Sequence, residues 1–332
     1  MSCLGENSMT AFLAGTLDAD RLEDVERHLD SCPLCRKAVA LVAAARTDAE
    51  SHFPRKGVVR LRPGTRLGRY LLEDPLGQGA MGIVYAARDE VLDRRVAIKM
   101  PGFRSASAID WFRREAQAMA RLMHRNVVTV YGLGELPEGN GVYIAMELIA
   151  GVTARRRIED HALPWRPALR IFVEAGQGLL AAHEAGLVHR DFKPDNVLVG
   201  DDGRVCVSDF GLSVAARIAH PGSVAGSPVY MAPEQMRGGP IDARTDVFAF
   251  CVSVYEAVYG VRPFAGRTLA ALEEEIRAGR LIKPARGGDL PGSVGEAIRA
   301  GLRDRPWERP RLPELVAELR GACAPRVFSE RS

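Results

Sequence analysis

The chain has 332 residues, of which 47% are hydrophobic and 26% charged, a composition that is ordinary for a globular protein of one or two domains. Its formal net charge of +3 gives no sign of nucleic-acid binding. The longest apolar stretches, such as 247–258, fall short of the roughly 20 residues that span a bilayer, and no basic start and apolar run mark a signal peptide, so we expect a cytoplasmic protein without a membrane span.

Four residues near the N-terminus have the chemistry and spacing of a zinc site. Cys3, His28, Cys32 and Cys35 form the pattern Cys-x24-His-x3-Cys-x2-Cys. His28 and Cys32 lie four apart at the end of a helix expected to begin near residue 18, so both point to one side, and a second helix is expected over 34–45. This spacing resembles the zinc-binding domain of bacterial anti-sigma factors. The resemblance implies a small all-helical module, residues 1–50, held together by structural Zn²⁺.

Other interpretations of the cysteines stay open. Cys32 and Cys35 are a redox-active pair in one alternative, although that motif normally follows a strand and none is expected here. In two others the cysteines are buried in a metal-free helical bundle, or Cys3 is too frayed to bind and three ligands remain. Cys206, Cys251 and Cys323 are far apart and are expected in the core or the tail.

A basic segment follows the module. Residues 54–69 carry six arginine and lysine residues and no acidic residue. We interpret 51–67 as a solvated linker, and the alternative is a docking strip for an acidic partner or for lipid headgroups.

Three predicted elements come next in the chain. Segment 76–84, Leu-Gly-Gln-Gly-Ala-Met-Gly-Ile-Val, has glycines whose missing side chains let backbone N–H groups approach phosphates. A strand is predicted over 96–99 and a helix, containing Glu115, over 110–123. Further on, Arg155-Arg156-Arg157 belongs either to a plain surface helix or to a surface that favours acidic substrates.

Segment 189–196, His-Arg-Asp-Phe-Lys-Pro-Asp-Asn, and the later Asp-Phe-Gly at 209–211 contain the groups that phosphoryl transfer requires. These groups are a carboxylate that orients and deprotonates the attacking hydroxyl, a cation for the phosphate, and oxygen ligands for magnesium. Asp191, Lys193, Asn196 and Asp209 supply them in that order. Strands predicted over 197–199 and 205–207 would form a hairpin that brings Asn196 and Asp209 side by side.

These motifs resemble the catalytic loop and metal-binding segment of the protein kinases, most closely the bacterial eukaryotic-type (Hanks-type) serine/threonine kinases. Further family motifs occur in order: the glycine-rich loop at 76–84, Ala232-Pro233-Glu234 with its partner Arg309, and Asp246, which braces the catalytic loop. The resemblance covers 68–322. It implies a two-lobed α+β fold, with a small β-rich N-lobe (68–147), a larger helical C-lobe (148–322) and a tail (323–332).

The resemblance also implies the site residues. Lys99 pairs with Glu115 and holds the α- and β-phosphates, Asp191 and Lys193 complete the catalytic set, and Asn196 and Asp209 bind Mg²⁺ or Mn²⁺. The residues expected around ATP are Leu76, Gly77, Gln78, Gly79, Ala80, Met81, Gly82, Ile83, Val84, Ala97, Lys99, Glu147, Leu148 and Leu198. Ser223 and Ser227 lie in the activation segment, and a phosphate on Ser223 would pair with Arg190.

We therefore predict a non-specific serine/threonine protein kinase that transfers the γ-phosphate of Mg-ATP to proteins, itself included, in bacterial cytoplasmic signalling. Lys193 favours a Ser or Thr acceptor, and the segment 232–234 favours a protein substrate. The N-terminal module would bind a regulatory protein partner. The alternative is a catalytically slow kinase fold that acts mainly as a partner-binding, anti-sigma-like regulatory module.

Overall fold

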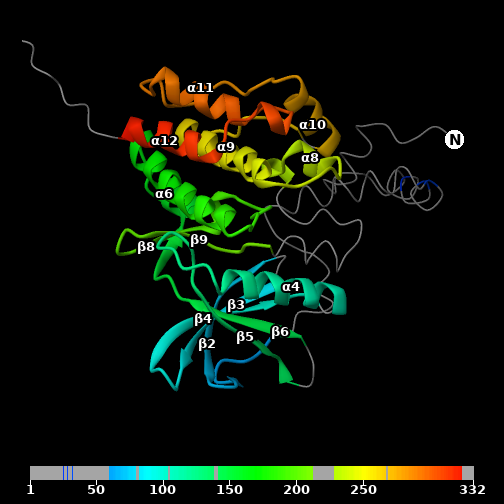
Figure 1. Cartoon of the computed structure of the whole chain (residues 1–332), viewed down its shortest axis with the longest axis vertical. Coiled ribbons are helices and arrows are strands. Elements are labelled where there is room, and N and C mark those ends of the chain that lie inside the picture. The colour runs from blue at the N-terminus through cyan, green and yellow to red at the C-terminus, as the bar shows by residue number, and fades with distance from the viewer. Residues whose placement is uncertain are drawn as a thin grey trace, which may run out of the picture.

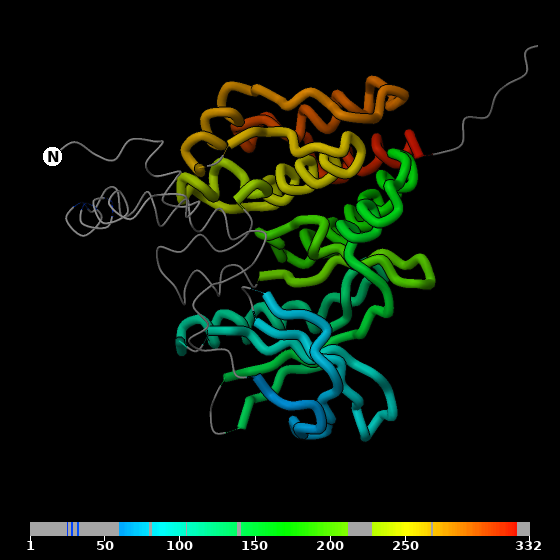
Figure 2. The backbone as a smooth tube through the Cα atoms, turned by 180° about the vertical axis from the view of Figure 1, so that it is seen from behind, coloured from blue at the N-terminus to red at the C-terminus, as the bar shows by residue number. Residues whose placement is uncertain are grey.

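The structure, a computed structural model, describes residues 60–79, 82–103, 105–137, 141–211, 228–266 and 268–323, together with Val25, His28 and Cys32. A strand-rich lobe and a helical lobe lie one beyond the other along the longest axis (Figure 1). The view from behind shows the same division, with the blue and cyan strands at one end and the yellow to red helices at the other (Figure 2). The expected two-lobed α+β architecture is confirmed.

The smaller lobe is built on an antiparallel sheet. In the part of the chain that the structure describes, the sheet has six strands in the order β1-β2-β3-β4-β6-β5. The strands are β1 (Arg66–Leu67), β2 (Tyr70–Gly79), β3 (Gly82–Asp89), β4 (Arg94–Pro101), β5 (Val130–Glu135) and β6 (Val142–Glu147). The strand predicted over 96–99 is the middle of β4, where Val84 pairs with Lys99 and Ala86 with Ala97. Leu72, Ile83 and Ile98 belong to the core of this lobe.

Helix α4 (Ala106–Met119) packs against the sheet through Phe112 and Ala116. It begins four residues before the prediction because Ser105 is an N-cap, whose hydroxyl accepts a hydrogen bond from the Ala108 N–H at 3.4 Å. It ends at Met119 rather than at residue 123, because the N–H groups of Arg121 and Leu122 bond three residues back and close the helix with a tighter turn. The prediction of a helix around Glu115 is confirmed, whereas its bounds were wrong.

The larger lobe is mainly helical. Its helices are α5 (Ala154–Asp160), α6 (Trp165–Glu184), α8 (Pro233–Met236), α9 (Ala243–Tyr259), α10 (Leu269–Arg277), α11 (Gly292–Gly301) and α12 (Leu312–Cys323), with short 3₁₀ turns η2 (Pro194–Asn196), η3 (Pro228–Tyr230) and η4 (Pro306–Glu308). Helix α9 is apolar on all sides and lies in the centre of the lobe, as a fully buried helix should. Cys251 on α9 is in the core, and Cys206 and Cys323 are buried too. Among the described residues no helix is long and apolar enough to cross a bilayer.

The predicted hairpin between the two catalytic motifs is confirmed. Strands β7 (Gly151–Thr153), β8 (Val197–Gly200) and β9 (Val205–Val207) form a second antiparallel sheet, with β8 and β9 as the hairpin. Its turn contains Gly203 at a φ of 83°, a left-handed conformation that favours glycine. The backbone N–H of Ser208 donates to the carbonyl of Asn196 at 2.9 Å, so the residues just outside the two strands are neighbours.

Candidate active site

The catalytic loop brings two polar side chains, those of Lys193 and Asn196, to Asp191. Lys193 Nζ lies 3.0 Å from Asp191 Oδ2. The amide nitrogen of Asn196 donates to the Asp191 carbonyl oxygen at 2.8 Å and approaches Asp191 Oδ2 at 3.4 Å. Asp191 is thereby held in one orientation by a cation and an amide that both come from its own loop.

Asp246 supports this loop from within the core. Its carboxylate is fully buried and accepts the backbone N–H groups of His189 and Arg190, each at 2.8 Å, and it also contacts His183 Nε2 at 2.7 Å. Arg190 has a φ of 68°, so the two N–H bonds hold a left-handed backbone that an arginine rarely adopts. The bracing role expected for Asp246 matches this geometry.

His189 is part of the same support. Its imidazole is fully buried, its Nε2 lies 2.9 Å from the Ser208 carbonyl oxygen, and its ring packs on Phe210 with centroids 4.5 Å apart. The ring therefore links the catalytic loop to the segment that carries Asp209, in agreement with a structural rather than chemical role.

Two residues with oxygen donors stand at the open end of the hairpin, just outside its strands. Asn196 follows the catalytic loop into β8, and Asp209 follows β9, with a φ of 68° at Asp209. Because the side-chain nitrogen of Asn196 donates to Asp191, the side-chain oxygen Oδ1 of Asn196 is the atom left for a metal. A carboxylate and an amide oxygen are hard ligands that suit Mg²⁺ or Mn²⁺, so this donor set fits the expected cation.

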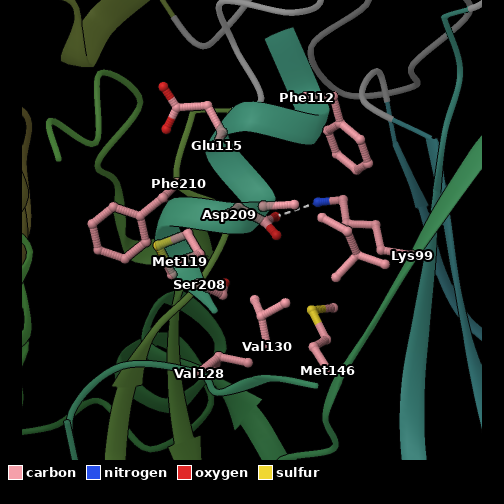
Figure 3. A pocket seen from close by; sticks show the side chains of 12 residues that line it. Lys99, Phe112, Glu115, Met119, Val128, Val130, Met146, Ser208, Asp209 and Phe210 are labelled. Atoms are coloured by element: carbon pink, nitrogen blue, oxygen red, sulfur yellow. Dashed lines mark ion pairs between the residues drawn. The ribbon is translucent and has the colours of Figure 1, made fainter. Parts of the chain in front are cut away.

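Lys99 lies at the inner side of the same site. It is almost fully buried on β4, and its Nζ is 2.6 Å from Asp209 Oδ2 (Figure 3). A buried ammonium requires an opposite charge, and Asp209 supplies it. The lysine of the N-lobe and the acid of the C-lobe are thus in direct contact.

The expected pair between Lys99 and Glu115 is not formed. Glu115 points away from Lys99 (Figure 3), and a Cβ atom built on Gly211 would lie 2.7 Å from Glu115 Oε2. That oxygen is buried and has no hydrogen-bond partner. Burial raises the pKa of Glu115, while the positive charge of Arg190 partly offsets the rise. The physical reason for the difference is that Asp209 takes the lysine while Glu115 packs against the Gly211 backbone.

Arg190 contacts the same face of α4. Its guanidinium lies 5.3 Å from the ring centre of Trp111, one helical turn before Glu115. Arg190 Nε and Trp111 Nε1 are both buried without a hydrogen-bond partner. The arginine predicted to receive an activating phosphate is thus packed against α4. Ser223 and Ser227, the two predicted acceptors in the activation segment, lie outside the described residues.

A small cavity lies beside Lys99, between α4 and the sheet (Figure 3). Lys99, Asp209 and Glu115 contribute its charged groups. The rest of its lining is Phe112, Ala116, Met119, Val128, Val130, Ile144, Met146, Ser208 and Phe210. Sequence reasoning did not anticipate this cavity, because its lining comes from segments whose packing no motif records.

The glycine-rich loop occupies the end of β2 and the start of β3. Gly82 has a φ of 128°, and a Cβ there would lie 2.0 Å from the Met100 carbonyl oxygen, so close strand packing alone requires glycine at this position. Gly77, Gln78 and Gly79 lie in β2, and Ile83 and Val84 in β3; Leu76 is exposed. Ala80 and Met81 lie outside the described residues. Of the other residues expected around ATP, Ala97 is buried, while Val84 and Leu198 are partly exposed.

The predicted nucleotide residue Glu147 uses its side chain elsewhere. Its two carboxylate oxygens accept a fork of hydrogen bonds from Arg204, one of them at 2.7 Å, and the Thr129 N–H approaches at 3.4 Å. These bonds lower the pKa of Glu147. The Glu147 side chain is therefore not free to meet a nucleotide. The contact between Arg204 and Glu147 was not predicted, because its one signal in the sequence is that the two side chains have opposite charges.

The end of the activation segment is fixed as expected. Arg309 Nη1 and Nη2 each lie 2.8 Å from an oxygen of Glu234, and the Thr245 hydroxyl donates to Glu234 at 2.8 Å. Both charged groups are buried. The predicted ion pair is confirmed.

The N-terminal site can be followed only at His28 and Cys32. The Cys32 N–H donates to the His28 carbonyl oxygen at 2.8 Å, which is the spacing of one helical turn. Cys3 and Cys35 lie outside the described residues. Among the residues that are described, no group of three or more His, Cys, Asp or Glu side chains could hold a metal. The zinc ligands stay a prediction.

Comparison with known proteins follows the same division. The protein kinase domain model matches residues 70–310. The chain belongs to the protein kinase family. A second model, a putative zinc-finger, matches residues 6–36, which include His28, Cys32 and Cys35 but not Cys3. The resemblance of both parts to known families is thereby confirmed.

Bacterial relatives agree with this assignment. The serine/threonine-protein kinase PknL of Mycobacterium tuberculosis is 42% identical over 205 residues, 60% of this chain and 51% of that protein. PrkC of Bacillus subtilis is 36% identical over 269 residues, 77% of this chain and 40% of the relative. The chain thus spans about half the length, or less, of these relatives. A crystal structure of the PknI kinase domain from Mycobacterium tuberculosis has a TM-score of 0.63 at 24% identity, covering 80% of this chain and 100% of that one, and confirms the fold.

Proposed function

We propose that this chain is a serine/threonine protein kinase that transfers the γ-phosphate of Mg-ATP to Ser or Thr residues of proteins, itself included, in the bacterial cytoplasm. One observation carries the proposal: the Lys99–Asp209 ion pair lies just after β9 and the group around Asp191 lies just before β8, so both are at the open end of one hairpin. The names of the relatives point the same way, since PknL and PrkC are serine/threonine-protein kinases. We assign the non-specific serine/threonine class.

Each residue has a distinct task in this proposal. Asp191 orients the acceptor hydroxyl and accepts its proton, and Lys193, 3.0 Å away, holds the Asp191 carboxylate in place and would bind the transferred phosphate. Asn196 and Asp209 would hold Mg²⁺, which supplies positive charge for the phosphates. Lys99 would turn from Asp209 to the α- and β-phosphates. Catalysis then rests on positioning and charge rather than on covalent chemistry.

The test is incorporation of labelled phosphate into the protein itself and into a generic acceptor protein. Asp191→Asn should reduce the rate by about 100-fold or more, because a positioned general base contributes that much. Asp201→Asn, a change of the same kind in the exposed hairpin turn, is the matched control and should keep the wild-type rate. A folded Asp191→Asn protein with wild-type activity would contradict the assignment.

The alternative of a slow, partner-binding kinase fold would be favoured by a replaced catalytic residue. Lys99, Asp191, Asn196 and Asp209 are all present. Under that alternative the wild-type chain itself would incorporate little phosphate, so the same experiment separates the two functions.

We propose that residues 1–50 form an N-terminal module with a structural zinc site. The basic linker 51–67 would join this module to a catalytic domain, residues 68–322, whose lobes are 68–147 and 148–322. The tail is 323–332. Cys3, His28, Cys32 and Cys35 would leave no open coordination position, so the metal would support a regulatory partner surface and take no part in phosphoryl transfer. Elemental analysis under reducing conditions should find one zinc per chain. Cys32→Ser should lose it, whereas Cys206→Ser should not; a zinc content near zero in the wild type would refute the site.

A further inference from the structure

Arg155, unlike its neighbour Arg156 in the arginine run 155–157, has a side chain that is largely covered by the C-lobe. Helix α5 begins at Ala154, with the Thr153 hydroxyl capping the Arg156 N–H at 3.2 Å. Arg156 stays at the surface, where it pairs with Asp160 one turn later. The side chain of Arg155 is only 22% exposed and runs toward the catalytic loop. The three arginines therefore do not form one basic surface.

The guanidinium of Arg155 joins elements that are far apart in sequence. Its Nε lies 2.9 and 3.0 Å from the two oxygens of Asp195 in η2. One terminal nitrogen is 3.4 Å from Glu256 Oε1 on α9, and the other donates to the hydroxyl of Tyr230 in η3. The Tyr230 hydroxyl in turn donates to Glu256. Arg155 also lies 3.4 Å from Glu159 Oε1 one turn along α5, and it neutralises two further carboxylates, those of Asp195 and Glu256, that face the same space.

This space borders the residues assigned to the acceptor. Asp195 stands between Lys193 and Asn196, and both of these side chains contact Asp191. A protein segment whose hydroxyl reaches Asp191 carries neighbouring residues at about 3.3–3.6 Å per position, so residues one to three places away stay within reach of η2. Because the Asp195 side chain is 42% exposed, such a residue can contact it.

Resting on the kinase function proposed above, we propose that Arg155 determines acceptor specificity. It occupies, from within the chain, the place that an arginine or lysine of the acceptor protein would take beside Asp195 and Glu256. A basic acceptor residue would find both carboxylates already paired, with a second cation, Arg262, 3.2 Å from Glu256. Acceptors with a basic residue close to the hydroxyl are therefore disfavoured. The same contacts leave Arg155 with no capacity to hold an acidic acceptor.

The experiment compares two serine peptides with the full-length protein. The peptides are identical except that one carries arginine and the other alanine within three residues of the serine. The wild type should use the arginine peptide no better than the alanine peptide, judged by kcat/KM. Arg155→Gln should raise the ratio of the two kcat/KM values by about tenfold or more, because it frees charged hydrogen-bond partners for the peptide. Arg156→Gln is the matched control and should leave the ratio unchanged.

A double variant sharpens the test, since adding Asp195→Asn to Arg155→Gln should remove the gained preference. An active Arg155→Gln protein with the wild-type ratio overturns the proposal. If Arg155→Gln does not fold, the wild type decides alone: a preference for the arginine peptide of more than about threefold rejects the proposal. A protein that binds ATP but phosphorylates neither peptide nor itself refutes the kinase function, whereas an active enzyme with the wrong preference refutes only the role of Arg155.

Discussion

The two faces of the catalytic loop differ in how their buried polar groups are satisfied. Below the loop, every oxygen of Asp246 and Glu234 has a partner at 2.7–2.9 Å. On the side of α4, one polar atom each of Trp111, Glu115 and Arg190 is buried without a partner. An unsatisfied buried polar group costs about 1–3 kcal/mol of stability. The region around Asp246 and Glu234 is therefore fixed, whereas the region on the side of α4 would become more stable if a rearrangement gave its polar atoms partners. We infer that the lobe interface at α4 is where this kinase changes state.

Arg190 belongs to both regions. Its backbone N–H is held by Asp246, whereas its guanidinium lies over Trp111. A phosphate that drew the Arg190 side chain away would remove the charge that faces Glu115, and the loop backbone would stay in place. Glu115 would then have Lys99 as its nearest cation along the inner face of α4, which is the pair that the sequence predicts.

The largest effect should come from breaking the fixed region at its ion pair. Arg309→Met leaves the Glu234 carboxylate buried without its cation and should lower the free energy of unfolding by about 3–5 kcal/mol. Chemical denaturation of the full chain measures this loss. Arg305→Met is the control, because Arg305 makes an exposed pair with Glu308 and its loss should cost less than about 1 kcal/mol. Similar losses in both variants would contradict the comparison.

A smaller loss is expected at Asp246. Asp246→Asn keeps the shape but turns one acceptor into a donor that faces buried N–H groups, so the free energy of unfolding should fall by about 2–3 kcal/mol. The rate of phosphoryl transfer should fall with it, because His189 and Arg190 lose their anchor. Asp242→Asn, at the exposed N-cap of the same helix, should cost at most about 1 kcal/mol and leave the rate unchanged.

A substitution on the side of α4 should have the smallest effect on stability, and it should stabilise the protein where the substitutions at Arg309 and Asp246 destabilise it. Burial raises the pKa of Glu115, so its contribution to stability is present below its unfolded pKa and is lost as the pH rises through its folded pKa. In the wild type the buried Glu115 carboxylate must ionise as the pH rises, which costs stability, whereas the glutamine of Glu115→Gln cannot ionise. The stability of Glu115→Gln relative to the wild type should therefore increase as the pH is raised from about 4 to 7. Phosphoryl transfer by the variant should nevertheless decrease. Thermal unfolding at several pH values checks the first result, and a relative stability that fell with pH would refute it.

Several contacts could be predicted from the sequence, because the spacing of the residues, or a family motif, determines which residues lie together. The turn between 200 and 203 allows only a hairpin, and the hairpin brings Asn196 and Asp209 together. Asp246 and the Glu234–Arg309 pair were equally predictable, since the family motif specifies both partners. The Asp246 contacts and the Glu234–Arg309 pair lie in the region where all the carboxylate oxygens of Asp246 and Glu234 are hydrogen-bonded.

Other features depend on which of several acceptable partners a side chain selects after packing. Lys99 has two acids within its motif set and contacts Asp209 rather than Glu115. Arg155 and Arg204 bind carboxylates that lie 40 and 57 positions away, which no spacing rule reports. The start of α4 was missed because the capping capacity of Ser105 was not considered. The tertiary environment therefore decides the state of the site, and the motifs decide its composition.

The Arg204–Glu147 fork also constrains how the lobes can move. It joins the β8–β9 turn of the C-lobe to the last residue of β6, and close by the Val128 N–H donates to Val207 at 2.9 Å. Other contacts cross beside the fork, since the Val207 N–H donates to the Asn126 carbonyl oxygen at 2.9 Å and the Asn126 amide donates to the Val205 carbonyl oxygen at 2.8 Å. Sliding of one lobe across the other would break these contacts, whereas rotation about the line that joins them would preserve them. Opening and closing should therefore be a hinge motion, widest at the glycine-rich loop.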